Sequence, residues 1–146
     1  MRLDCCCNYT SHRKWFTSVL KGLDVVLCLT SALELLDLFN GYVHEDEIDV
    51  YSKALLPFEN VNCFVVDDFD SLEIVEIGGL RCTSVNQTFN DLFRHFDDID
   101  EQSLIEGLSD YYFSHGKSFD ELKIDPQYTD NFEKIKEWAK EYYSYG

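Results

Sequence analysis

The sequence predicts an α+β fold: a small, mostly antiparallel sheet with helices packed on one side of it, and a helical C-terminal half. Two observations lead to this prediction. Apolar residues recur about every 3.6 positions in residues 29–39 and again from residue 84 onward, whereas strand-like segments fill most of the region between. Strands grouped between helices are typical of α+β proteins. The 146 residues are expected to form one domain with a core large enough to fold alone.

Two helices are expected before the strands. Thr10–Leu20 carries the only conspicuous basic cluster of the chain, and we expect it to form a short helix. A second helix is predicted over residues 29–39, because its apolar side chains fall on one face. Thr30 or Ser31 would be its N-cap, and Gly41 would end it.

The strand region begins after this second helix. Alternating apolar and polar residues, bounded by turn residues, predict strands at Ile48–Ser52, Val61–Val66, Leu72–Ile77 and Leu80–Thr83. The last two would form a hairpin, because the Gly78-Gly79 pair tolerates the positive φ angles of a tight turn.

The rest of the chain is predicted to be helical, in residues 84–96, 102–113, 119–122 and 131–145. The last helix would bury Phe132, Ile135, Trp138, Ala139 and Tyr142. Four helix starts show capping-box spacing, in which a short polar residue precedes Glu or Gln by three positions. These pairs are Ser84 with Gln87, Asp98 with Glu101, Ser118 with Glu121, and Asp130 with Glu133.

The charge of the chain argues against nucleic-acid binding. It has 28 acidic against 12 basic residues, a net charge of −16 and a pI near 4.4. Phosphates would repel such a surface, whereas a basic protein would be attracted to it. The longest apolar run, near Val25–Leu29, is too short to cross a bilayer, and no secretory signal is recognisable. We therefore expect a cytoplasmic protein with a protein partner.

The cysteines and the catalytic motifs point to no enzyme. Three of the six cysteines are consecutive (Cys5, Cys6 and Cys7) and the others lie in apolar stretches, so we expect free thiols and no metal site. Glycine-rich nucleotide loops and serine-hydrolase motifs are missing from the sequence. We predict no catalytic residues and no cofactor.

The candidate partner-binding residues lie at the junction between the hairpin and the next helix: Arg81, Asn86, Gln87 and Asp91. Gln87 and Asp91 are four positions apart, which places both on the face opposite the apolar stripe, where we expect them to be accessible. Two structural alternatives stay open. The segment could serve only to cap the helix through Ser84, and Arg81 and Asp91 could form only a surface ion pair.

Two stretches, "LTSALELLDLFNGYVHEDEIDVYSK" and "CFVVDDFDSLEIVEIGGLRCTSVNQTFNDLF", resemble the AbiEi-type antitoxin family of type IV toxin–antitoxin systems. The resemblance covers residues 28–146 and rests on Ser31, Ala32, Leu33, Ile77, Gly79, Leu80, Arg81, Thr83, Ser84, Thr88, Asp91 and Leu92. The chain departs from the family pattern at Asn86-Gln87, where the family has Glu-Arg. Residues 1–27, expected to be a helical segment, also leave no room for the family's winged-helix DNA-binding domain.

The resemblance implies a specific function. Family members neutralise a nucleotidyltransferase-type toxin through the part that this chain resembles, so the chain would be an antitoxin-like protein without its own DNA-binding domain. A second interpretation of the acidic composition is a small inhibitor, for example an anti-defence interaction protein, that occupies a basic site on its partner.

Overall fold

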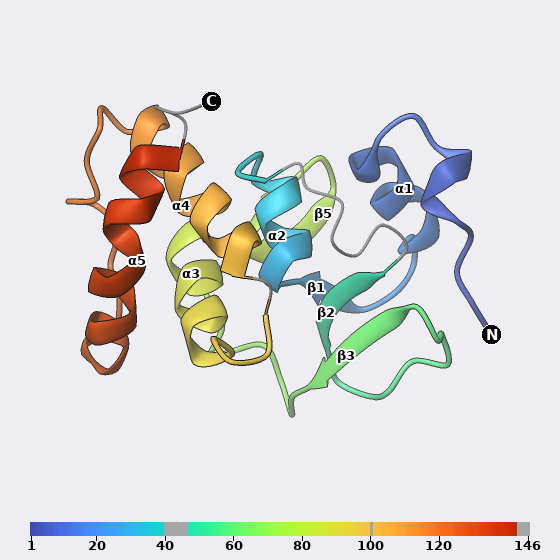
Figure 1. The fold of residues 1–146 in the computed structure, drawn as a ribbon. Helices are drawn as coiled ribbons and strands as arrows, with labels where there is room; N and C mark the ends of the chain where they lie inside the picture. Colours follow the sequence, from blue (N-terminus) through green and yellow to red (C-terminus); the bar gives the residue numbers. More distant parts are fainter. Residues whose placement is uncertain (40–46, 100, 143–146) are drawn as a thin grey trace.

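The computed structural model describes residues 1–39, 47–99 and 101–142, and it confirms the α+β class (Figure 1). The helices are α1 (His12–Val19), α2 (Leu29–Leu35), α3 (Val85–Arg94), α4 (Glu101–Ser114) and α5 (Thr129–Glu141), with short 3-10 turns η1 (Cys6–Asn8) and η2 (Pro126–Tyr128). The strands are β1 (Val25–Leu27), β2 (Ile48–Ser52), β3 (Val61–Val65), β4 (Ile74–Ile77) and β5 (Leu80–Thr83).

The five strands form one mixed sheet in the order β3-β2-β1-β5-β4. The β1–β2 and β4–β5 pairs are antiparallel and hold slightly more of the paired positions than the parallel β2–β3 and β1–β5 pairs. The Gly78-Gly79 turn of the β4–β5 hairpin is confirmed, with φ angles of 59° and 83°. Both angles lie in the left-handed region that glycine enters without steric cost.

The central strand, β1, was not predicted from the sequence. All three of its residues are buried, so its sequence lacks the alternation by which a half-buried strand is recognised. Residues 1–27 are therefore not only helical, because they also supply the middle of the sheet. Without β1 the two outer strand pairs would have nothing to join them.

Helices cover both faces of the sheet, whereas the sequence suggested one. Trp15 and Phe16 of α1 pack with Val25, Leu27 and Val50 on one face. The other face packs against the core formed by α3, α4 and α5. Figure 1 shows α1 and α5 at opposite ends of the molecule. None of the helices in the described part of the chain is long and apolar enough to cross a membrane.

Helix α2 begins and ends differently from the prediction. Its N-cap is Cys28, which makes no side-chain cap bond. Thr30 and Ser31 instead bond to Asp49 of β2, through the Asp49 carboxylate and backbone N–H respectively. The helix ends at Leu35 in a Schellman turn, in which Asp37 has a φ of 63° and the Leu38 N–H donates to the Leu33 carbonyl. The predicted stop at Gly41 lies outside the described residues.

None of the four predicted capping boxes is complete among the described residues, and only Ser84 caps its helix. Residues 119–122 form a turn rather than a helix, with Ser118 accepting from the Asp120 N–H. Helix α5 begins at Thr129 with Tyr128 as its N-cap, so Asp130 lies inside the helix. Helix α4 begins at Glu101, and residue 100 before it lies outside the described residues. The last helix was expected to continue to residue 145, but residues 143–146 also lie outside the described residues.

Candidate functional site

Ser84 is the N-cap of α3, as the sequence predicted. Its hydroxyl accepts from the Gln87 N–H at 3.1 Å. The reciprocal half of the capping box is absent, because the Ser84 N–H donates to the Glu73 carbonyl. The Gln87 amide instead accepts from the Glu73 N–H at 3.1 Å and donates to Asp91 at 3.0 Å. Gln87 thus joins α3 to the segment that leads into β4.

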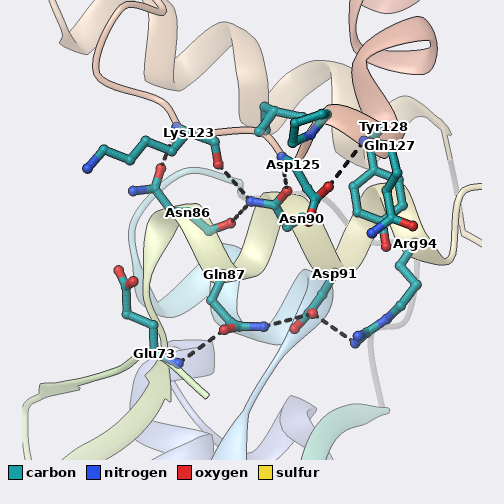
Figure 2. Close-up of a pocket in the computed structure, with 12 residues that line it drawn as sticks. Glu73, Asn86, Gln87, Asn90, Asp91, Arg94, Lys123, Asp125, Gln127 and Tyr128 are labelled. Carbon is teal, nitrogen blue, oxygen red and sulfur yellow. Dashed lines mark hydrogen bonds and ion pairs between the residues drawn. The ribbon is translucent and has the colours of Figure 1, made fainter. Parts of the chain in front are cut away.

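Asn86 and Asn90 hold the connection between α4 and α5 against α3 (Figure 2). The Asn86 side-chain oxygen accepts from the Lys123 N–H at 2.9 Å. Asn90 bonds the same connection twice, donating to the Lys123 carbonyl at 2.8 Å and accepting from the Asp125 N–H at 2.7 Å. Both amides satisfy backbone groups of a segment with no regular secondary structure. Asn86 therefore has a structural role, and Asn90, four positions later, shares it.

A surface pocket of about 520 Å³ lies between α3 and residues 123–128. Its wall includes Gln87, Asp91 and Arg94 from α3, and Gln127 and Tyr128 from η2. Figure 2 shows these side chains around the opening. The lining contains acidic, basic and amide groups, but no cysteine, serine or histidine that could be a nucleophile or its base.

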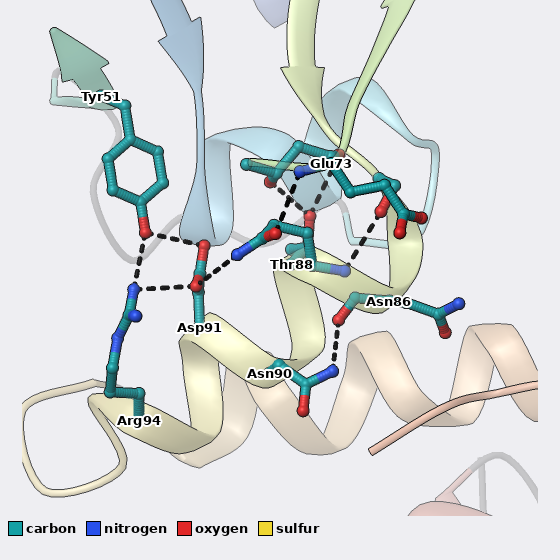
Figure 3. Close-up of polar contacts among 10 residues, drawn as sticks. Tyr51, Glu73, Asn86, Thr88, Asn90, Asp91 and Arg94 are labelled. Atoms are coloured by element: carbon teal, nitrogen blue, oxygen red, sulfur yellow. Dashed lines mark hydrogen bonds and ion pairs between the residues drawn. The ribbon is translucent and has the colours of Figure 1, made fainter. Parts of the chain in front are cut away.

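Asp91 forms a buried polar network with Tyr51 and Arg94, in addition to its bond with Gln87 (Figure 3). Its side chain is only 2 % exposed. The Tyr51 hydroxyl donates to one carboxylate oxygen at 2.9 Å, and the Arg94 guanidinium donates to the other at 2.8 Å. Arg94 also donates to the Tyr51 oxygen at 2.7 Å. The expectation that Asp91 is accessible to a partner is therefore wrong.

The network changes the titration of its members. Burial raises the pKa of Asp91, while hydrogen bonds from Tyr51 and Gln87 and the charge of Arg94 oppose that rise. Burial, followed by the charge of Asp91, raises the pKa of Tyr51 well above its ordinary value. The Tyr51 hydroxyl therefore stays protonated and donates its hydrogen bond to the Asp91 carboxylate. These hydrogen bonds join β2 to α3, and each of the three side chains bonds to the other two.

Arg81 lies away from the other three predicted residues. Its guanidinium pairs with Asp24 at 2.7 Å, donates to the Val25 carbonyl at 3.2 Å, and stands 5.3 Å from the centroid of the Phe69 ring. The suggested ion pair between Arg81 and Asp91 is therefore not formed. Only Asn86, Gln87 and Asp91 are brought together, and hydrogen bonds within the protein engage all three.

The sequence interpretation also misplaced Trp138. Helix α5 buries Ile135 and Ala139, but Trp138 is 49 % exposed. Beside it on α5 runs an exposed acidic stripe formed by Asp130, Glu133, Glu137 and Glu141. We call Trp138 and these four residues the α5 face. A large aromatic side chain at the surface, bordered by charge, is a composition typical of a binding surface.

The comparisons with known proteins give no family. No protein-family model matches the chain, and a search of curated proteins finds no significant match. Among the described residues, no group of three or more His, Cys, Asp or Glu side chains is placed to hold a metal ion.

Proposed function

We propose that the protein is an antitoxin-like inhibitor that acts by binding rather than by catalysis, and that the α5 face contacts a basic protein partner. The observation that carries the proposal is the exposure of Trp138 beside four carboxylates on one helix. The net charge of −16 also favours a basic partner for the molecule as a whole.

The energetics of interfaces favour this surface over the predicted α3 site. Tryptophan is enriched among the few residues that dominate binding energy, because it removes a large apolar area from water. The acidic stripe would speed the encounter with a cationic partner and fix its orientation. Glu133 and Glu137 of the α5 face make only surface ion pairs with Lys136 and Lys140, at 3.3 Å each, and such pairs are weak. The polar side chains of α3, in contrast, bond to other segments of the chain, and Asp91 does so in a buried position. A partner would have to break those bonds before it could use them.

The kind of partner comes from the resemblance to AbiEi-type antitoxins, which points to a nucleotidyltransferase-type toxin. We infer that the chain occupies a basic surface of such a toxin, where substrate phosphates would otherwise be attracted. This mode of action needs no DNA contact by the protein itself. The net charge of −16 agrees with it.

Co-expression with a nucleotidyltransferase-type toxin, sought first among the genes next to that of the protein, tests the proposal. Wild-type protein should restore growth and bind the purified toxin. Trp138→Ala should weaken binding by about 2 kcal/mol, or roughly 30-fold in Kd. Val65→Ala is the matched control, because Val65 is also about half exposed but lies on β3. Failure of wild-type protein to bind or rescue would contradict the antitoxin function.

Charge reversal separates the electrostatic contribution. The Glu133→Lys, Glu137→Lys double variant should slow association and lose much of its salt dependence. Asp67→Lys with Glu76→Lys is the control, because it makes the same change in net charge at exposed positions away from α5. Equal effects of the two double variants would show that only the overall charge matters. The α5 face would then be the wrong surface.

A further inference from the structure

The N-terminal cysteines form two chemically different groups. Cys6 packs against the core cluster that contains Trp15 and Phe16. Cys5 is half-buried and Cys7 is exposed, and their sulfur atoms lie 2.7 Å apart. A disulfide bond is about 2.05 Å long, so only a small approach separates these thiols from bonding. The pair joins residues two positions apart and was not predicted from the sequence, in which adjacent cysteines are poorly placed to bond.

The turn that carries the pair is held by several hydrogen bonds. The Cys7 N–H donates to the Cys5 sulfur at 3.4 Å, which orients that sulfur toward Cys7. The Asp4 carboxylate accepts from Asn8 at 2.7 Å and from the Tyr9 hydroxyl at 3.0 Å. The Trp15 indole N–H donates to the Asp4 carbonyl at 2.8 Å. These contacts anchor the turn to α1 and keep the two sulfurs close without covering Cys7.

The other cysteines in the core have the opposite environment. Cys28 and Cys82 are fully buried. Burial raises the pKa of Cys82 to about 11 and that of Cys28 well above its ordinary value, which disfavours the reactive thiolate. The Cys5–Cys7 geometry also suits a disulfide better than a shared metal. Two thiolates on one tetrahedral zinc, with Zn–S bonds of about 2.3 Å, would be about 3.8 Å apart.

We propose that Cys5 and Cys7 form a redox-active dithiol that is oxidised to an intramolecular disulfide by small-molecule disulfides such as glutathione disulfide. The exposed Cys7 thiolate attacks one glutathione sulfur, which breaks the S–S bond and releases one glutathione thiolate. The Cys5 thiolate then attacks the Cys7 sulfur and releases the second. The protein loses two protons and two electrons, and one glutathione disulfide becomes two glutathione molecules. Cys6 takes no part.

The reaction can be followed on the full-length protein. Reduced protein is incubated with glutathione disulfide, the remaining thiols are alkylated, and the peptide of residues 3–13 released by trypsin is analysed by mass spectrometry. We expect this peptide to lose the mass of two hydrogens and to carry one alkyl group, on Cys6. An alkyl group on Cys5 or Cys7 of the oxidised peptide would overturn the proposal, as would stable glutathione adducts in place of the disulfide. This measurement needs no variant to fold.

Three variants assign the roles. Cys6→Ser, the matched control, should oxidise as the wild type does. Cys5→Ser should lose the internal disulfide and keep glutathione on Cys7, because the resolving thiol is missing. Cys7→Ser should form neither the internal disulfide nor a glutathione adduct at this turn, because the attacking thiol is missing. A disulfide that forms in Cys5→Ser or Cys7→Ser through Cys6 would show that the three thiols are interchangeable, and the proposed pair would be wrong.

Discussion

Helices α3 and α5 have the same kind of sequence and opposite surroundings. Both are amphipathic, and both bury one apolar face in the same core. The polar side of α3 is then covered by the segment before β4, by Tyr51 of β2 and by residues 123–125. The outer side of α5 is left open, with Trp138 on it. Periodicity shows which face meets the core, but it does not show how many neighbours pack on the other face.

The largest expected effect comes from removing the carboxylate of Asp91. Asp91→Ala would leave the buried Tyr51 hydroxyl without its acceptor and remove the partner of Arg94, whose side chain is half exposed and can be solvated, so we expect a loss of about 2 to 4 kcal/mol in the free energy of unfolding. Urea denaturation followed by circular dichroism measures it. Asp97→Ala, at an exposed position just after α3, should change stability by less than about 0.5 kcal/mol. Similar effects of the two substitutions would show that Asp91 is not a buried partner.

Tyr51→Phe tests the same network through pH. Loss of the hydroxyl should cost about 1.5 to 3 kcal/mol at neutral pH, since it bonds to charged groups. Folding raises the pKa of Tyr51, so its contribution is fully present below the ordinary value of 10.0 and is lost as pH rises toward the folded-state pKa. The stability difference between wild type and Tyr51→Phe should therefore narrow above pH 10.0. A constant or widening difference would contradict the assigned environment.

Asn90→Ala should have an intermediate effect of about 1 to 2 kcal/mol, because Lys123 and Asp125 lose backbone partners that surface water can partly replace. Asn86→Ala removes one bond to the same connection and should cost less. Hydrogen exchange should show faster exchange at the Asp125 N–H in Asn90→Ala and at the Lys123 N–H in Asn86→Ala. Unchanged exchange in both variants would mean that the two amides do not hold this segment.

The smallest expected effect on stability is that of Trp138→Ala. The side chain is half exposed, so we expect a change of less than about 0.5 kcal/mol in thermal or urea unfolding. Ile135→Ala, three positions earlier and fully buried, should cost about 2 to 5 kcal/mol. If Trp138→Ala were as destabilising as Ile135→Ala, Trp138 would be a core residue, and the contrast between α3 and α5 would disappear.

The sequence by itself determined the parts of the protein that depend on neighbouring residues. The four predicted strands, the glycine turn, the Ser84 cap and the net charge follow from alternation, backbone freedom and composition, although β2 is buried at all five of its positions. Of the candidate site, the sequence indicated that Gln87 and Asp91 share a face of α3, because helical spacing is local. Their hydrogen bond at 3.0 Å agrees with that spacing.

The tertiary structure decided everything that depends on segments distant in sequence. It placed β1 at the centre of the sheet, where burial on both faces leaves no alternating pattern. It buried Asp91 beneath Tyr51, forty positions earlier, and separated Arg81 from it by pairing Arg81 with Asp24. It also left Trp138 exposed. An aromatic residue next to the apolar stripe of a helix is buried only if another element packs over it, and in the described part of the chain none covers this one.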